Sequence, residues 1–261
     1  MTTELIGVLY PLMWTFLCVL SRIGMLLLLM PPLLGSSVPM QVRALMAIML
    51  AACLTPMVLD NAAPLPSSLI VMTIQIAKEL LLGMLFGSAI QVVITGLQVG
   101  GQVMSSLASM DIAESADPMS QDTTAVLNQM LSWVAMALFL ILGGHRQLLN
   151  CCMDSFAYYP AGAVAAEEHW LMHVHDLLHH SLSIGIRAAA PVAIALLLAN
   201  LITALIGRTM PQMNIMAIGF GINLSVLLWM LTVSIGSIGW VFQSELAGWL
   251  ERTADLFPVR S

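Results

Sequence analysis

The residues best suited to chemistry are histidines, which gather in one short stretch of the chain. They form two interleaved sets at helical spacing: His169, His173, Asp176 and His180, together with His175 and His179. Imidazoles spaced in this way can share a metal ion. The alternative, which we favour, is an amphipathic surface helix with leucines between the histidines on its apolar side. No phosphate-binding loop, zinc-protease motif or nucleophile elbow occurs in the sequence. We therefore expect no catalytic residues, no metal site and no cofactor.

Some charged residues stand inside apolar runs, where charge is costly. Arg22 lies within the first apolar run, and Lys78 and Glu79 lie within the third. Charges at such positions indicate function or pairing. The alternative is that a long basic side chain extends to the membrane interface. Chains of acids and histidines typical of proton relays are not evident within the apolar runs, which disfavours a self-sufficient proton-coupled transporter.

A stripe of uncharged polar residues follows the third apolar run at steps of three or four residues. It consists of Ser88, Gln91, Thr95, Gln98, Gln102 and Ser105. This spacing places all six on one face of a helix. On an otherwise apolar helix, such a face meets a partner helix or lines a water-filled channel. Both interpretations remain open, and we expect the long helix to bend near Gly100 and Gly101.

The composition indicates what kind of secondary structure positions these residues. Of 261 residues, 59% are hydrophobic and 8% are charged, and the mean hydropathy is +0.94. Ordinary soluble domains have about 25% charged residues. In lipid all backbone polar groups must be paired internally, and the long unbroken apolar runs favour helices over a barrel. The fold class is therefore all-α and integral to the membrane. The net charge of −6 without a basic run gives nucleic acid no electrostatic footprint.

Six apolar runs approach the roughly 20 residues that a membrane-spanning helix needs. They cover residues 5–30, 42–59, 69–95, 127–143, 182–206 and 215–242. The first run is too long for the core of a cleavable signal, so we expect it to be retained. The connections are short, which predicts a single membrane domain over residues 1–261. Their Lys and Arg residues show no bias that would fix the orientation.

The third connection, residues 111–124, is acidic and is accompanied by methionines, notably Met104, Met110 and Met119. Methionine is flexible and adapts to irregular apolar surfaces. Beside a polar helix face, this segment could act as a deformable seal. The alternative is an ordinary solvated loop whose acids are merely exposed.

Several local patterns, in order along nearly the whole chain, resemble the FliR family of flagellar biosynthesis proteins and its virulence-secretion relatives. The positions that carry the resemblance are Val38, Pro39, Arg43, Glu79, Gly83, Gly87, Gly101, Asp117, Pro118, Gly144, His145, Arg208, Pro211, Gln212, Asn214, Gly219 and Phe220. The chain departs from the family after Phe220, where Gly221, Ile222 and Asn223 replace the usual Pro-Leu-Lys.

The resemblance implies a non-catalytic subunit that builds an export gate with FliP-like and FliQ-like subunits. Unfolded flagellar proteins would pass through its central pore, with FlhB-like and FlhA-like export components as further partners. It also implies a multi-pass protein of the bacterial inner membrane and the flagellar basal body. In this family many apolar helices lie within the assembly, in contact with protein as well as lipid. The alternatives are a homologous virulence-secretion subunit or, less favoured, a stand-alone small-solute permease.

The resemblance also implies that the segment matching residues 104–122 plugs the closed pore. We expect its apolar contacts to be Met104, Leu107, Met110, Ile112 and Met119. Apolar side chains block ions by dewetting, and flexible methionines would yield to varied unfolded chains.

Overall fold

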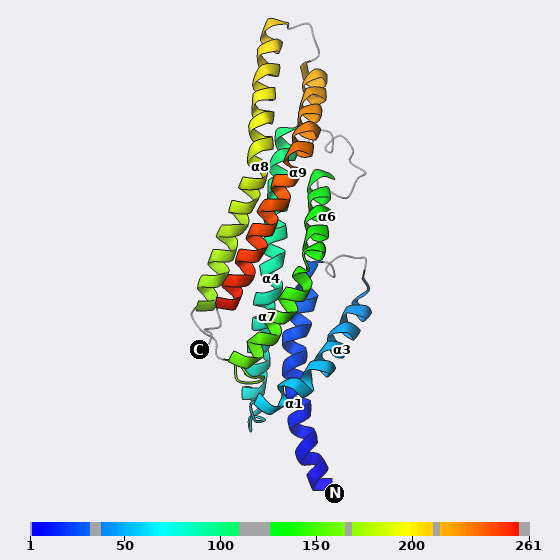
Figure 1. Ribbon diagram of the computed structural model, residues 1–261, viewed down its shortest axis with the longest axis vertical. Helices are drawn as coiled ribbons and strands as arrows, with labels where there is room; N and C mark the ends of the chain where they lie inside the picture. The colour runs from blue at the N-terminus through cyan, green and yellow to red at the C-terminus, as the bar shows by residue number, and fades with distance from the viewer. Residues whose placement is uncertain (1, 32–37, 110–125, 165–168, 211–214, 256–261) are drawn as a thin grey trace. The chain divides into compact units, whose positions relative to one another are not determined.

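In the computed structural model, the described residues are 2–31, 38–109, 126–164, 169–210 and 215–255, and they form α-helices and one short 3-10 helix (Figure 1). The elements, in chain order, are α1 (Thr2–Leu29), α3 (Met40–Val58), η1 (Leu59–Asn61), α4 (Leu69–Leu107), α6 (Val126–Ile141), α7 (Gly144–Tyr158), α8 (His169–Thr209) and α9 (Ile215–Asp255). The prediction of an all-α membrane protein is confirmed.

The prediction of six spans is not confirmed. Within the described residues, four helical segments are long and apolar enough to cross a membrane, namely 9–29, 40–61, 69–107 and 178–209. A fifth span arises if α6 and α7 count together, because a break between them interrupts the predicted run 127–143. Gly143, with φ of +70°, lies at that break. Among the residues of α9 whose side chains are described, the apolar stretch covers 218–234, which does not test the full predicted run 215–242.

The chain divides into two compact units. The first unit contains residues 1–91, 143–177 and 247–261. It comprises α1, α3, η1, α4 up to Gln91, all of α7, the start of α8 and the end of α9. Within it α3 packs along α1 (Figure 1). Its core includes apolar side chains of α1 such as Val19, Ile23 and Leu26.

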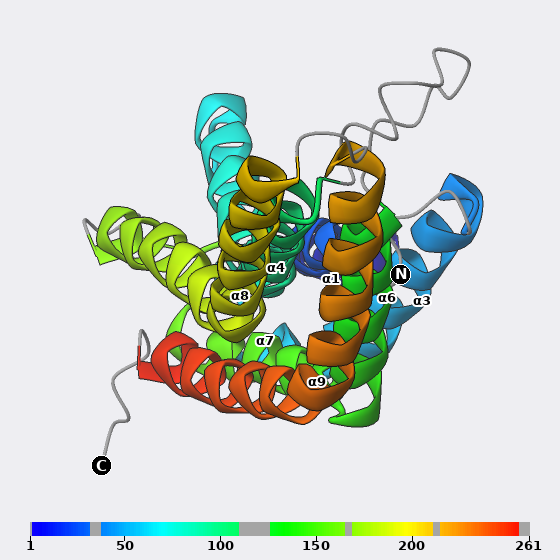
Figure 2. The ribbon, with the colours of Figure 1, turned by 90° about the horizontal axis from the view of Figure 1, so that it is seen from above.

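The second unit contains residues 92–142 and 178–246. Here α8 lies against α4, as Figure 2 shows from above. The approach is so close that a Cβ atom at Gly96 would stand 2.3 Å from the Ser181 carbonyl oxygen, and one at Gly185 would stand 2.4 Å from the Gly96 carbonyl oxygen. Only glycine permits this backbone contact, which follows the small-residue packing of membrane helices.

Helix α4 contributes to both units and has 39 residues. At 1.5 Å per residue it is about 58 Å long, nearly twice the thickness of a bilayer core of ~30 Å. The helix continues through Gly100 and Gly101 without a break, so the bend expected there does not interrupt it. An element of this length must extend well beyond the hydrocarbon layer at one or both ends.

Candidate functional site

The first unit holds a buried ion pair between two residues that the sequence marked separately. Nε of Arg22 on α1 donates to Oε2 of Glu79 on α4 over 2.6 Å, and neither side chain is exposed to solvent. Burying two charges costs several kcal/mol per ion unless both are well paired. Whether this pair stabilises the fold therefore depends on the hydrogen bonds and contacts that its two side chains make.

Each remaining direction around the pair is occupied. The terminal nitrogens of Arg22 donate to Oγ of Ser155 (2.8 Å) and to the carbonyl oxygen of Tyr159 (3.0 Å). The guanidinium lies 3.9 Å from the centre of the Phe156 ring. Oε1 of Glu79 accepts from the backbone N–H of Gly162 (2.9 Å). The cluster thus joins α1, α4, α7 and the turn after α7. Within the described residues, these partners make it a buried structural network.

The family motif Glu79, Gly83 and Gly87 occupies one face of α4, at steps of four residues, and this face packs against α1. A Cβ atom at Gly83 would stand 2.2 Å from the carbonyl oxygen of Arg22, and one at Gly87 would stand 2.6 Å from Cβ of Leu29. The glycines therefore allow the two helices to approach closely enough for Glu79 to reach Arg22.

Replacing Gly83 by alanine is expected to destabilise the protein by about 1–3 kcal/mol, because the methyl group would collide with backbone that cannot move aside. Gly24 on α1 provides the matched control, since a Cβ atom added there would meet no atom within 4 Å. There an alanine should be neutral or stabilising by up to about 1 kcal/mol, as expected for Gly to Ala within a helix. Thermal denaturation of the two variants in detergent measures the difference, and equal midpoints would contradict the packing argument.

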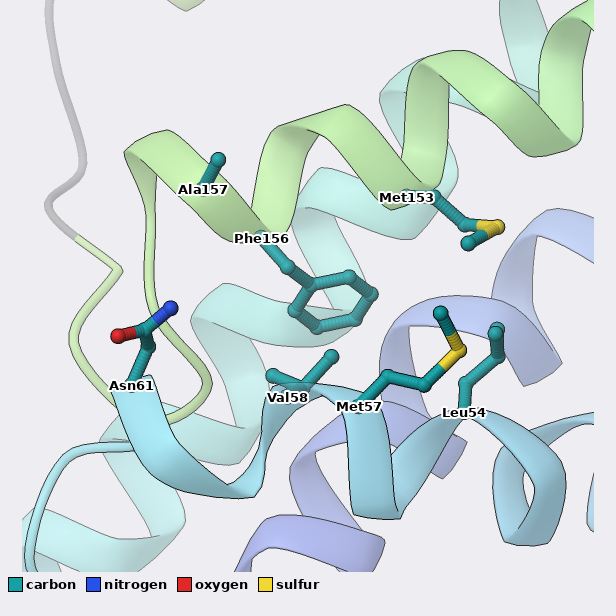
Figure 3. A pocket seen from close by; sticks show the side chains of 7 residues that line it. All are labelled: Leu54, Met57, Val58, Asn61, Met153, Phe156 and Ala157. Carbon is teal, nitrogen blue, oxygen red and sulfur yellow. The ribbon is translucent and has the colours of Figure 1, made fainter.

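A groove of about 190 Å³ lies between α3 and α7 and shares a wall with this cluster (Figure 3). Its lining comprises Leu54, Met57, Val58, Asn61, Met153, Phe156 and Ala157. Phe156 points from α7 toward Val58 in Figure 3, and the same ring contacts the Arg22 guanidinium. Phe156 therefore belongs both to the wall of the groove and to the surroundings of the buried ion pair.

Other motif positions of the first unit lie at helix beginnings. Pro39 is the N-cap residue of α3, and Nε of Arg43 donates to the carbonyl oxygen of Val38 over 3.1 Å. Gly144 is buried at the first position of α7, and His145 follows it half-buried. These residues thus lie where α3 and α7 begin.

The polar stripe of α4 divides between buried and exposed positions. Ser105 is buried; Ser88, Gln91 and Gln98 are half-buried; Thr95 and Gln102 are exposed. Nε2 of Gln98 donates to Oγ of Ser132 on α6 over 2.7 Å, and Ser88 bonds to the Leu85 carbonyl of its own helix. Part of the stripe thus joins helices, as one interpretation held, while the exposed part leaves a polar surface on α4.

The expected seal begins at the end of α4. Met104 is fully buried, and Leu107 is half-buried with its carbonyl oxygen bonded to Nδ2 of Asn200 on α8. The other proposed contacts, Met110, Ile112 and Met119, lie outside the described residues, as do Asp117 and Pro118. Their arrangement stays a prediction.

The remaining motif positions of the second unit have separate surroundings. A Cβ atom at Gly101 would stand 2.8 Å from Cδ1 of Leu131 on α6, and one at Gly219 would stand 3.1 Å from Cγ2 of Thr203 on α8. Arg208 and Phe220 are exposed. Pro211, Gln212 and Asn214 lie outside the described residues.

The histidine group lies in the first turns of α8. The side chains of His175, Asp176 and His179 are exposed, and the His179 and His180 rings meet edge to face, 6.0 Å apart. The side chains of His169 and His173 lie outside the described part of the structure. Among the side chains that are described, no group of three potential metal ligands comes together.

Sequence reasoning missed several residues of these networks. Ser155 and Gly162 complete the ion-pair cluster, and Asn200 and Asn223 join α4, α8 and α9 in the second unit. A lone amide within an apolar run carries the same signal as a lone charge, because it too needs a buried partner. Asn200 and Asn223 both stand in such runs.

Long apolar helices with several candidate membrane spans define a multi-pass helical membrane protein. The chain belongs to the bacterial export proteins, family 1, whose sequence profile matches residues 13–248. It is a FliR-type subunit of a type III protein-export apparatus, which confirms the family expected from the motifs.

Individual relatives agree with this assignment. The flagellar biosynthetic protein FliR of Caulobacter vibrioides is 26% identical over 92% of this chain and 93% of its own length. FliR of Escherichia coli K12 is 26% identical over 82% of this chain and 79% of its own length. The Yop proteins translocation protein T of Yersinia pestis is 25% identical over 58% of this chain and 59% of its own length. The relatives are thus export and secretion components, and the chain is a multi-pass membrane protein of the flagellar export apparatus.

Proposed function

We propose that the chain is a non-catalytic core subunit of the flagellar export gate in the inner membrane, at the flagellar basal body. It forms the pore with FliP-like and FliQ-like subunits, works with FlhB-like and FlhA-like components, and passes unfolded flagellar proteins. The similarity to FliR proteins over most of the chain supports the flagellar role over a virulence role.

The observation that carries the proposal is the exposed polar surface of α4. Thr95 and Gln102 are exposed on a helix whose other residues are mainly apolar, and the side chains of Gln91, Thr95 and Gln102 make no hydrogen bond within the described residues. Lipid cannot satisfy these groups. They need a partner subunit or a water-filled passage, and a pore built jointly with partners supplies both.

The gate itself is proposed to be the segment from Met104 to Asp122. Its start is anchored, since Met104 is buried and Leu107 is bonded to α8. Apolar side chains beyond this anchor block ions by excluding water. The acidic residues of the segment favour a position that water reaches.

An affinity-tagged chain is expected to co-purify with FliP-like and FliQ-like subunits from detergent-solubilised membranes. Replacing both Thr95 and Gln102 by leucine should reduce this association or slow the export of flagellar subunits. Replacing Thr73, an exposed residue of the same helix outside the stripe that bonds to Leu69 of its own turn, by valine is the matched control. The proposal fails if the purified chain, alone in liposomes, transports a small solute, because that result identifies a permease.

A further inference from the structure

Two amides, one buried and one half-buried, form a hydrogen-bonded ladder across three helices of the second unit. Nδ2 of Asn223 on α9 donates to Oδ1 of Asn200 on α8 over 2.6 Å. Nδ2 of Asn200 in turn donates to the backbone carbonyl oxygen of Leu107 on α4 over 3.0 Å. Asn223 is only 3% exposed and Asn200 is half-buried, so the ladder is buried at its α9 end and partly buried at α8.

The Leu107 carbonyl determines the direction of the whole ladder. A carbonyl oxygen only accepts, so Asn200 must turn its NH₂ group toward α4. Its amide oxygen then faces Asn223, which must turn its own NH₂ group toward Asn200. A change at Asn223 therefore alters the group that holds α4, although no hydrogen bond joins Asn223 directly to α4.

Leu107 is the last residue of α4, and the last four carbonyls of a helix have no partner within it. Local bonds satisfy two of them: Ala108 N–H donates to the Met104 oxygen (3.0 Å), and Ser109 N–H donates to the Ser106 oxygen (3.1 Å). Ser109 has φ of +61°, a left-handed conformation that ends the helix. Asn200 supplies the cap for Leu107 from a different helix.

We propose that Asn200 and Asn223 are positioning residues of the export gate. Their ladder fixes the last turn of α4 to α8 and α9, and so sets the point from which the plug begins. Because of this link, a movement of α8 or α9 is transmitted to the last turn of α4, where the proposed plug begins. The inference rests on the proposed function of residues 104–122, and its test separates the two.

Asn223→Asp and Asn200→Asp are the primary variants, because aspartate has the shape of asparagine but lacks the donor. Asn200→Leu is a second variant that places no carboxylate beside the Leu107 carbonyl. In the assembled complex, amide hydrogen exchange in residues 102–109 is expected to rise about fivefold in each variant, as for the loss of one hydrogen bond. Ion leakage through the idle complex should rise with it. Exchange in residues 82–90 of α4 should stay unchanged.

Thr209→Val on α8 and Ser225→Ala on α9 are matched controls, since each hydroxyl bonds to a carbonyl of its own helix. They should leave both exchange and leakage at wild-type values. The ladder is refuted if Asn223→Asp leaves exchange at residues 102–109 unchanged, or if it raises exchange equally throughout the chain.

Leakage is compared with that of a complex lacking residues 106–116. If the deletion leaks but the ladder variants, with faster exchange, do not, the amides do not position the gate and the inference is wrong. If the deletion itself does not leak, the plug is refuted, whereas exchange in Asn223→Asp still decides whether the ladder holds α4.

Discussion

Replacing Arg22 or Glu79 alone by methionine is expected to lower the free energy of unfolding by about 3–5 kcal/mol, because each change leaves the other charge buried without its partner. Arg22→Met leaves the Glu79 carboxylate without its guanidinium, holding the Gly162 N–H among the described residues. Glu79→Met strands a guanidinium held by Ser155, Tyr159 and Phe156. Either variant should accumulate poorly in membranes and show a lowered thermal midpoint in detergent.

The double variant Arg22→Met/Glu79→Met is expected to recover much of this loss, since an apolar pair of similar volume carries no desolvation cost. Lys78→Met is the matched control: it removes the neighbouring charge, which is only half-buried and lies outside the cluster. A double variant as unstable as the sum of the single variants would contradict this account. It would indicate that the Ser155, Tyr159 and Gly162 bonds matter more than the ion pair.

Sequence analysis identified Arg22 and Glu79 as unusual charges but did not predict that they form a pair. Each stood out because a charged residue in an apolar run needs a reason. Their pairing requires a register between α1 and α4, whose paired residues lie 57 positions apart in the chain, and apolar helices can slide past one another without changing their hydropathy. The glycines set that register: Gly83 and Gly87 give a small-residue spacing that indicates close packing, yet the sequence does not name the helix they meet.

The fold class and family followed from composition and local motifs, whereas the number of spans did not. Hydropathy sums apolar residues and is insensitive to a break such as the one at Gly143, where φ is +70°. In an assembly, the surface of an apolar helix can meet protein as well as lipid, so hydropathy alone does not count crossings.

The candidate gate was the least accessible to sequence reasoning. The family resemblance, more than the methionines and acids, pointed to the segment. Its proposed anchoring involves Asn200 and Asn223, two amides in apolar runs far along the chain. Their role follows from the spatial meeting of α4, α8 and α9. The polar stripe was visible as a pattern, and the structure was needed to separate Gln98, which bonds to Ser132, from exposed Thr95 and Gln102.

Deleting residues 106–116 is expected to open a permanent ion leak through the assembled export complex while the complex remains intact. The deletion leaves Met104 at the end of α4 and removes Leu107, Met110 and Ile112, three of the five proposed apolar contacts. Without them, water can fill the constriction and ions can follow. Measurements of ion flux in cells or proteoliposomes should show leakage well above that of the wild-type complex, and co-purification of the partner subunits checks assembly.

Two further variants test whether the apolar side chains of this segment, and not simply its length of chain, block the ions. Replacing residues 106–116 by an equally long Gly-Ser linker keeps the connection and should leak as the deletion does. Replacing Asp111, Glu114, Asp117 and Asp122 by their amides keeps every apolar contact and should stay closed, because dewetting depends on apolar side chains rather than on these charges. Normal assembly of the deletion variant with unchanged ion flux would make this segment a passive connector, and the pore would then need another barrier.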